Sequence, residues 1–158
     1  MKLNLLLNNQ NAFIPGYTNF DPYATPGSKV IKAGIDNLDY YLDNGECEII
    51  RAVGILTYFD SHEVDNILNN WISKLSINGN LILADVDVVE CMKAFNRNEI
   101  DLNKLNIFLY GEQNKKINYR KCALSMFDIS NFLIQKNMKI VKKYFEGLNF
   151  HIEAMRIK

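Results

Sequence analysis

The sequence predicts an α/β fold: a mostly parallel sheet with helices on both faces and an antiparallel hairpin at the C-terminus. Three observations lead to this prediction. Lys2–Leu7 is a short apolar run of the kind that forms a buried first strand. Apolar runs at 47–53 and 81–84 flank an amphipathic helix pattern, and this strand–helix–strand order is typical of parallel sheets. Near the end, Gly147 separates two strand-like segments, 138–145 and 150–155, as in a hairpin.

The first 45 residues are predicted to contain three short strands joined by loops. The first strand breaks at the polar segment Asn8–Asn11, and a second apolar run follows at Gly16–Phe20. A third short strand is expected at Lys29–Ala33. All three prolines of the chain fall between these strands, so the region should be rich in loops. Residues 36–43 are expected to form a short helix or turn.

The middle of the chain carries the clearest periodic pattern. Cys47–Val53 has apolar residues on both faces, as a buried parallel strand requires. In the helix that follows, Asp60 and Glu63 resemble a capping box, and Asn78–Gly79 is expected to end the helix. A later helix should end near Asn137. The first helix has an apolar face made of Val64, Ile67, Leu68, Trp71, Ile72 and Leu75.

Length and composition indicate the class of protein. At 158 residues the chain is long enough to bury its own core, so residues 1–158 are predicted to form one domain. It has no apolar run of membrane-spanning length and no basic, apolar leader, so a soluble cytoplasmic protein is expected. Its three cysteines suit a reducing compartment and fit neither a disulfide framework nor a C-x-x-C site. With only two histidines, no metal site is expected.

The net charge is zero, but the charges are unevenly distributed. Residues 1–70 carry 4 basic and 9 acidic side chains, whereas residues 71–158 carry 14 basic and 9 acidic ones. The basic half is either a polyanion-binding face or an ordinary solvated surface. The second interpretation is favoured, because no aromatic interleaving or recognition-helix pattern accompanies the lysines. A nucleic-acid partner is therefore not expected, and self-association stays open.

Several segments, among them Gly34–Leu38 and Gly54–Phe59, carry a resemblance to a known family. Lys2–Asn8 is similar to K-L-N-L-G-x-G, and Gly16–Asp21 to a following G-W-I-N-V-D segment. Leu75–Asn80 resembles L-K-P-G-G-x, and Asp85–Asp87 resembles the P-D that comes next. With these segments the chain resembles a small class I S-adenosylmethionine-dependent methyltransferase of bacterial and phage type. That family has a Rossmann-like sheet whose last strand is inserted antiparallel.

The resemblance implies S-adenosylmethionine as the cofactor. Asp21, which ends the second strand, would bond its ribose hydroxyls, and Asp36 would lie on the adenine side. Leu6, Asn8 and Gly54 would border the cofactor, although Leu6 and Asn8 replace two glycines that allow close approach in the family. By position alone, Asp21 is as readily a loop acid that starts the next turn, and Asp36 a helix cap.

Two further residues are candidates for contact with the methyl acceptor. Asp87 follows the carboxyl end of a predicted central strand, where open α/β sheets bind their ligands. Tyr58 is suited to stack or hydrogen-bond there, or equally to pack as an ordinary aromatic residue. The family has an E-H pair where this chain has Thr57 and Tyr58, and a histidine in place of Arg120. Both departures affect the chemistry expected at the acceptor.

Methyl transfer requires chiefly that the acceptor be aligned with the methyl group. A weak acid–base motif is therefore compatible with activity. The sequence predicts a methyltransferase acting on a small molecule or saccharide, which the retained Asp21 and Asp36 favour. The alternative is a catalytically inactive methyltransferase-like domain with a binding or assembly role, which the missing glycines favour.

Overall fold

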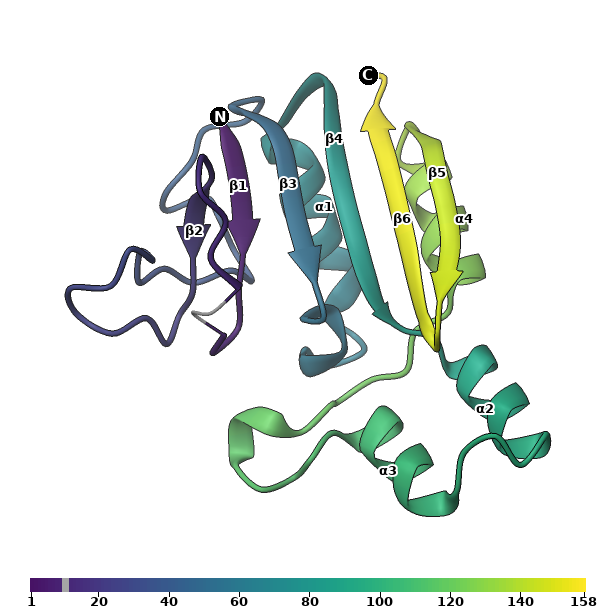
Figure 1. Ribbon diagram of the computed structural model, residues 1–158. Helices are drawn as coiled ribbons and strands as arrows, with labels where there is room; N and C mark the ends of the chain where they lie inside the picture. The colour runs from purple at the N-terminus through teal and green to yellow at the C-terminus, as the bar shows by residue number, and fades with distance from the viewer. Residues whose placement is uncertain (10–11) are drawn as a thin grey trace.

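A six-stranded sheet forms the centre of the molecule in a computed structural model, which describes residues 1–9 and 12–158 (Figure 1). Its strand order is β2-β1-β3-β4-β6-β5. The pairs β1–β2, β1–β3 and β3–β4 are parallel, whereas β6 lies antiparallel between β4 and β5. This confirms the predicted α/β fold and its C-terminal hairpin. The strands are β1 (Lys2–Leu5), β2 (Thr18–Phe20), β3 (Cys47–Val53), β4 (Leu75–Val86), β5 (Met138–Glu146) and β6 (Asn149–Arg156).

The helices lie in two places relative to the sheet. In Figure 1, α1 and α4 lie behind the sheet, while α2 and α3 lie beyond the carboxyl ends of its parallel strands. The side chains that face α1 and α4 are buried, whereas Ile49, Arg51, Ile82 and Glu153 alternate with them and stay partly exposed. The helices are α1 (Val64–Lys74), α2 (Val88–Asn96), α3 (Leu102–Tyr110) and α4 (Met126–Gln135), with short 3₁₀ turns η2 (Leu56–Tyr58) and η3 (Lys116–Asn118).

The third strand expected near the N-terminus is reduced to one parallel bridge, between Phe20 and Ile31. The Ile31 N–H donates to the Asn19 carbonyl at 2.8 Å, and the Asp21 N–H donates to the Ile31 carbonyl at 3.0 Å. Val30 is buried, but Ile31 is exposed, so little apolar burial favours longer pairing. The prediction of a full strand was therefore wrong. Of the expected first turn, residues 10–11 lie outside the described part of the chain.

The structure corrects both predicted ends of α1. Glu63 is the N-cap without a side-chain capping bond, and the Asp60 carboxylate instead pairs with Lys121 at 3.4 Å. The helix ends at Lys74, and Leu75 already begins β4. Gly79 lies within that strand, where a Cβ atom would come within 2.9 Å of the Cys47 carbonyl oxygen. The glycine therefore permits close strand pairing rather than ending a helix.

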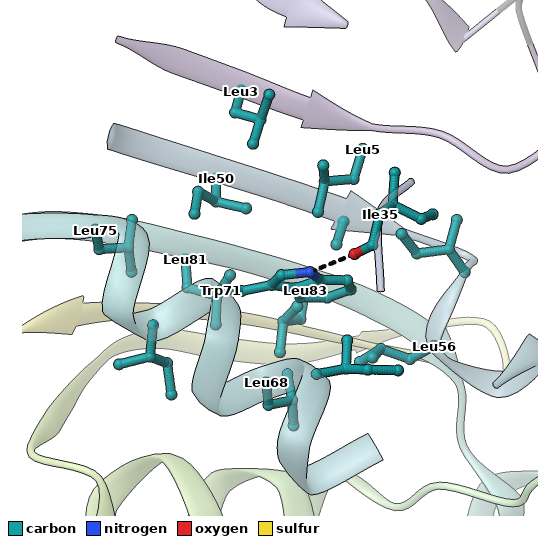
Figure 2. Close-up of a cluster of buried hydrophobic side chains, with 14 of the residues drawn as sticks. Leu3, Leu5, Ile35, Ile50, Leu56, Leu68, Trp71, Leu75, Leu81 and Leu83 are labelled. Carbon is teal, nitrogen blue, oxygen red and sulfur yellow. Dashed lines mark hydrogen bonds between the residues drawn. The ribbon is translucent and has the colours of Figure 1, made fainter. Parts of the chain in front are cut away.

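The main core lies between the sheet and α1 (Figure 2). Trp71 is fully buried, and its indole Nε1–H donates to the Ile35 carbonyl oxygen at 2.7 Å. This bond ties α1 to the segment that follows the Ile31 bridge. The apolar residues that surround it include Leu3, Leu5, Ile50, Leu56, Leu68, Leu81 and Leu83.

Beyond the sheet, α2 and α3 pack against each other around Val86, Cys91 and Leu105. The chain then returns beneath the strand ends through residues 111–125 before α4 begins (Figure 1). The Lys121 N–H donates to the Thr57 carbonyl at 2.7 Å and fixes this segment against the end of β3. The returning segment thereby forms one wall of the hollow described next.

Candidate functional site

A hollow of about 570 Å³ opens at the carboxyl ends of β1 and β3, and we call it the central cleft. It is lined by the first turn, by the segment after β3, by α3 and by the returning segment. Its volume falls within the range of about 300–1,000 Å³ that is usual for small-molecule sites. Of the predicted site residues, the cleft brings together Leu6, Asn8, Gly54 and Tyr58.

The first turn accommodates its two non-glycine residues in different ways. Leu6 is buried against Ala24 and Val30, and its N–H donates to the Phe20 carbonyl at 2.8 Å. Asn8 has a φ of 52°, in the left-handed region that asparagine tolerates better than most residues. Leucine therefore fills space with an apolar side chain, while asparagine preserves a glycine-like backbone conformation.

Asp21 holds the first turn against the end of β2. Its side chain is fully buried, and its Oδ1 accepts hydrogen bonds from the N–H groups of Asn8 at 3.0 Å and Tyr23 at 2.8 Å. Its Oδ2 accepts one from the Asn9 N–H at 3.1 Å. The carboxylate predicted to bond ribose hydroxyls is thus engaged by the protein's own backbone.

A buried amide pair that the sequence did not reveal fixes the loop after the first turn. Asn4 Nδ2 donates to Asn19 Oδ1 at 2.8 Å and to the Ala12 carbonyl at 3.1 Å. Arg51, which lines the central cleft, donates from Nη1 to Asn4 Oδ1 at 3.1 Å. The two asparagines, which face each other across neighbouring strands, therefore connect the loop to a cationic side chain of the cleft.

Gly54 and Tyr58 form the β3 side of the central cleft. Gly54 has a φ of +69°, and its N–H donates to the Ala84 carbonyl at 2.7 Å. Glycine suits this position because L-residues rarely adopt that backbone conformation. The guanidinium carbon of Arg120 lies 5.0 Å from the centre of the Tyr58 ring. The ring is thereby held at the cleft by a cation–π contact.

A buried ion pair lies beside Tyr58. The Asp85 Oδ1 accepts from Arg120 Nη1 at 2.8 Å and from the Thr57 hydroxyl at 3.0 Å, while its Oδ2 accepts from the Thr57 N–H at 3.1 Å. Arg120 Nη1 also contacts the Thr57 hydroxyl oxygen. The buried Nε of Arg120, a residue that lines the cleft, has no hydrogen-bond partner among the described residues. Both departures from the family pattern, at Thr57 and Arg120, thus belong to one network.

The structure places two other predicted site residues outside the central cleft. Asp36 is exposed and lines a separate hollow of about 290 Å³ beside Asn37 and Asn70. Asp87 is almost fully buried, and its carboxylate accepts from the N–H groups of Glu90 at 3.0 Å and Met126 at 2.7 Å. It therefore caps the first turns of both α2 and α4.

The three cysteines carry free thiols, of which Cys47 and Cys91 are buried and Cys122 is partly buried. Burial raises the pKa of the Cys122 thiol to about 11, and the pKa values of Cys47 and Cys91 are raised to about 11 for the same reason. Thiols with such pKa values stay protonated and are poor nucleophiles.

Two further groups of residues bear on ligands and on location. In the described part of the chain, one group with the ligand types of a metal site comes together, namely Asp60, His62 and Glu63, whose ligand atoms lie within 4.8 Å of one another. Asp60 already pairs with Lys121. None of the helices in the described ranges is both long enough and apolar enough to span a bilayer.

No protein-family model matches the chain, and no curated relative does either. Its fold is nevertheless similar to those of solved proteins. A methyltransferase from Methanosarcina mazei superposes with a TM-score of 0.64 at 12% identity over 98% of this chain and 92% of that one. A Mesorhizobium loti methyltransferase gives 0.64 at 13% identity over 98% and 90%.

Two matches come from Burkholderia thailandensis. The 1,6-didemethyltoxoflavin N1-methyltransferase, solved with its substrate and S-adenosylhomocysteine bound, gives a TM-score of 0.61 at 10% identity over 99% of this chain and 71% of that one. An O-methyltransferase family protein gives 0.62 at 10% identity over 98% of this chain, which spans about half (51%) of that protein. The inserted antiparallel strand and these likenesses together show that the chain has the Rossmann-like fold of class I S-adenosylmethionine-dependent methyltransferases.

Proposed function

We propose that this chain is an S-adenosylmethionine-dependent methyltransferase of a small molecule or saccharide, acting as one cytoplasmic domain. The observation that carries the proposal is the position of the central cleft. It lies at the carboxyl ends of β1 and β3, beside the first turn, in a sheet of methyltransferase topology. Ligands of open α/β sheets bind at such ends. The 1,6-didemethyltoxoflavin N1-methyltransferase of similar fold holds S-adenosylhomocysteine and the small molecule 1,6-didemethyltoxoflavin.

The residues around the cleft fit the cofactor once the first turn opens. The cleft is large enough, and the unpaired Arg120 Nε offers a hydrogen-bond donor. Asp21, however, becomes available to ribose hydroxyls only when Asn8 and Asn9 release its carboxylate. Hydrogen bonds to a charged group contribute about 1.5–3 kcal/mol each, so this release weakens cofactor affinity. We therefore propose binding that is coupled to a movement of the first turn.

The chain's own residues would align the acceptor. When bound, S-adenosylmethionine supplies the methyl group and the driving force for its transfer. Tyr58 lines the cleft, and a cation–π contact with Arg120 holds its ring in place. Asp87 lies too deep to touch an acceptor and would act by fixing α2 and α4 at the end of β4. Asp36 lines a separate hollow, so it would contact the adenine only if that hollow opened into the central cleft.

A second candidate function rests on the engagement of Asp21. Because its carboxylate is buried and bonded to three backbone N–H groups, the turn is stable without a ligand. A domain of this kind would keep the methyltransferase sheet for binding or assembly without catalysis. The missing glycines at Leu6 and Asn8 also favour this alternative.

Calorimetry with S-adenosylhomocysteine and S-adenosylmethionine separates the two functions. An enzyme should bind both with one site per chain, and it should form S-adenosylhomocysteine when an acceptor is added. Tyr58→Phe should then lower turnover, whereas Tyr40→Phe, at a residue 86% exposed and outside the cleft, should not. Absence of binding by the natural chain and by a variant with glycine at positions 6 and 8 would instead support the non-catalytic function.

A further inference from the structure

A second hollow, of about 730 Å³, adjoins the central cleft, and we call it the lysine pocket. Lys115, Lys116 and Lys121 line it. It shares Leu7, Asn8, Tyr58 and Ile117 with the central cleft, so a ligand that spans both hollows would pass beside the Tyr58 ring. The methyltransferase proposal assigns nothing to the lysine pocket.

The charges of the lysine pocket are only partly balanced. Lys121 pairs with Asp60 at 3.4 Å. Lys115 and Lys116 are exposed and form no ion pair with any residue that the structure describes. Two exposed lysines without an ion-pair partner on the wall of a hollow create a positive potential that attracts anions. Lysine is a common partner of phosphate groups in proteins.

Aromatic rings complete the walls of the lysine pocket. Tyr119 is 41% exposed and Tyr23 is 52% exposed, although both are large and partly apolar. Tyr58 and Phe59 line the pocket from the β3 side. Aromatic faces stack with nucleobases, and each stacked base contributes about 1–3 kcal/mol in proteins that bind single strands. Rings and cations thus occur together in a hollow next to the proposed site of methyl transfer.

We propose that the lysine pocket binds a nucleoside phosphate, with the phosphate on Lys115 and Lys116 and the base against the exposed rings. Resting on the proposed methyltransferase function, this makes the acceptor a nucleotide or a nucleotide-linked molecule whose reactive part reaches the central cleft past Tyr58. An acceptor of this class explains why an aromatic hollow carries unpaired cations. It also gives the basic half of the chain a specific ligand.

The test measures the binding of two nucleotides, uridine 5′-monophosphate and guanosine 5′-monophosphate, by calorimetry in the absence of a methyl donor. At least one nucleotide should bind at least tenfold more tightly than its nucleoside and than inorganic phosphate. Lys115→Ala with Lys116→Ala should weaken nucleotide binding at least tenfold. The matched control, Lys139→Ala with Lys158→Ala, removes the same charge at exposed positions outside the pocket and should change binding less than twofold. Tyr119→Ala should weaken nucleotide binding but not phosphate binding.

Several outcomes would overturn the proposal. One is that neither nucleotide binds. Another is that the two double lysine variants weaken nucleotide binding equally. A third is that a tetranucleotide binds more tightly than both mononucleotides, which would indicate that the ligand is a nucleic acid. The outcome is separable from that for the methyltransferase function. Nucleotide binding by a chain that fails to bind S-adenosylhomocysteine would support the pocket while overturning the acceptor role. The reverse result would overturn the pocket alone.

Discussion

The carboxylate of Asp21 accepts a hydrogen bond from the Asn8 backbone N–H at 3.0 Å, across the gap between the ends of β2 and β1. The second oxygen does the same for Asn9 at 3.1 Å. Asn8 donates its hydrogen bond with its backbone in the left-handed region, at a φ of 52°. The acid at the end of the second strand therefore closes the first turn. Ligand binding at this turn competes with the turn's own stability.

Asp21→Ala should lower the free energy of unfolding by about 3 kcal/mol, because it leaves buried N–H groups without an acceptor. If the cofactor binds, affinity for S-adenosylhomocysteine should fall as well, by about 1–3 kcal/mol, through loss of charge-assisted bonds to ribose. Urea denaturation and calorimetry measure the two effects. Asp36→Ala, at an exposed carboxylate, should change stability by less than about 0.5 kcal/mol. Equal effects of the two changes would show that the Asp21 bonds contribute little.

Replacement of both Leu6 and Asn8 by glycine should increase affinity for S-adenosylhomocysteine. Leu6→Gly removes a buried side chain beside the cleft and frees space under the turn, and glycine at position 8 retains the left-handed conformation with greater freedom to open. Because Leu6 is buried, its loss should destabilise the fold by about 2–5 kcal/mol, as similar truncations do. Asn8→Gly alone tests whether the turn restricts cofactor binding without the loss of stability that Leu6→Gly causes.

Asn98→Gly is the matched control, since Asn98 is exposed, has a φ of 57° and lies outside the cleft. It should leave affinity unchanged in calorimetry. Tight binding by the natural chain, with no gain in either glycine variant, would contradict the view that this turn restricts the cofactor.

The helices and strands whose buried side chains follow one clear apolar pattern could be predicted from the sequence. The alternation after Gly147 matches β6, and the helical spacing from Val64 to Trp71 matches α1. The end of α1 could not be placed, because Leu75 continues the helical spacing and yet begins β4. Helices α2 and α3 were not predicted, since few of their apolar residues are buried.

The start of each of these two helices does carry a local signal. Asp87 accepts from the Glu90 N–H at 3.0 Å, and Asp101 accepts from the Lys104 N–H at 2.8 Å. An aspartate that begins a helix in this way is a common N-cap. Asp87 was considered for catalysis because of its place after β4. Its second hydrogen bond, accepted from the N–H of the distant Met126, has no sequence signature.

The residues of the candidate site, like the fold, could be predicted only in part. Leu6, Asn8, Gly54 and Tyr58 are near the carboxyl ends of predicted parallel strands, and topology alone brings such residues together. The partners of Asp21 are backbone groups, which every residue except proline offers, so its engagement could not be anticipated. Arg120 meets Thr57 across 63 positions of sequence through a returning segment without a periodic pattern.

The ion pair between Asp39 and Lys74 should make stability depend on acid pH. Lys74 is 3% exposed, and its ammonium lies 2.7 Å from Asp39 Oδ1. This contact with Lys74 lowers the pKa of the Asp39 carboxyl below its ordinary value of 3.8. The pair therefore contributes fully above that value, and its contribution is lost as the pH falls through the lower folded-state pKa.

Thermal unfolding of the natural chain and of Asp39→Asn checks this dependence. The difference in midpoint between the two proteins should be constant from pH 7 to pH 5 and should shrink below pH 4. Asp43→Asn, at an exposed carboxylate outside the helices and without an ion pair among the described residues, is the control and should show no such change. A difference that stays constant at low pH would mean that Asp39 acts through packing rather than charge.

Arg120→Met should destabilise the protein strongly, because Asp85 would keep a buried charge without its cation. Arg120 has a side-chain exposure of 15%, and that of Asp85 is 0%. Breaking one side of such a pair typically costs about 3–5 kcal/mol, whereas replacing both partners costs much less. The double variant, with Arg120→Met and Asp85→Asn, should therefore recover part of the lost stability. Urea denaturation of the natural chain, the two single variants and the double variant gives the coupling energy between the two side chains. The arginine also holds Tyr58, so the double variant should retain its fold while losing the affinity of the central cleft for its ligands. A double variant no more stable than Arg120→Met would show that the arginine acts through Tyr58 and not through Asp85.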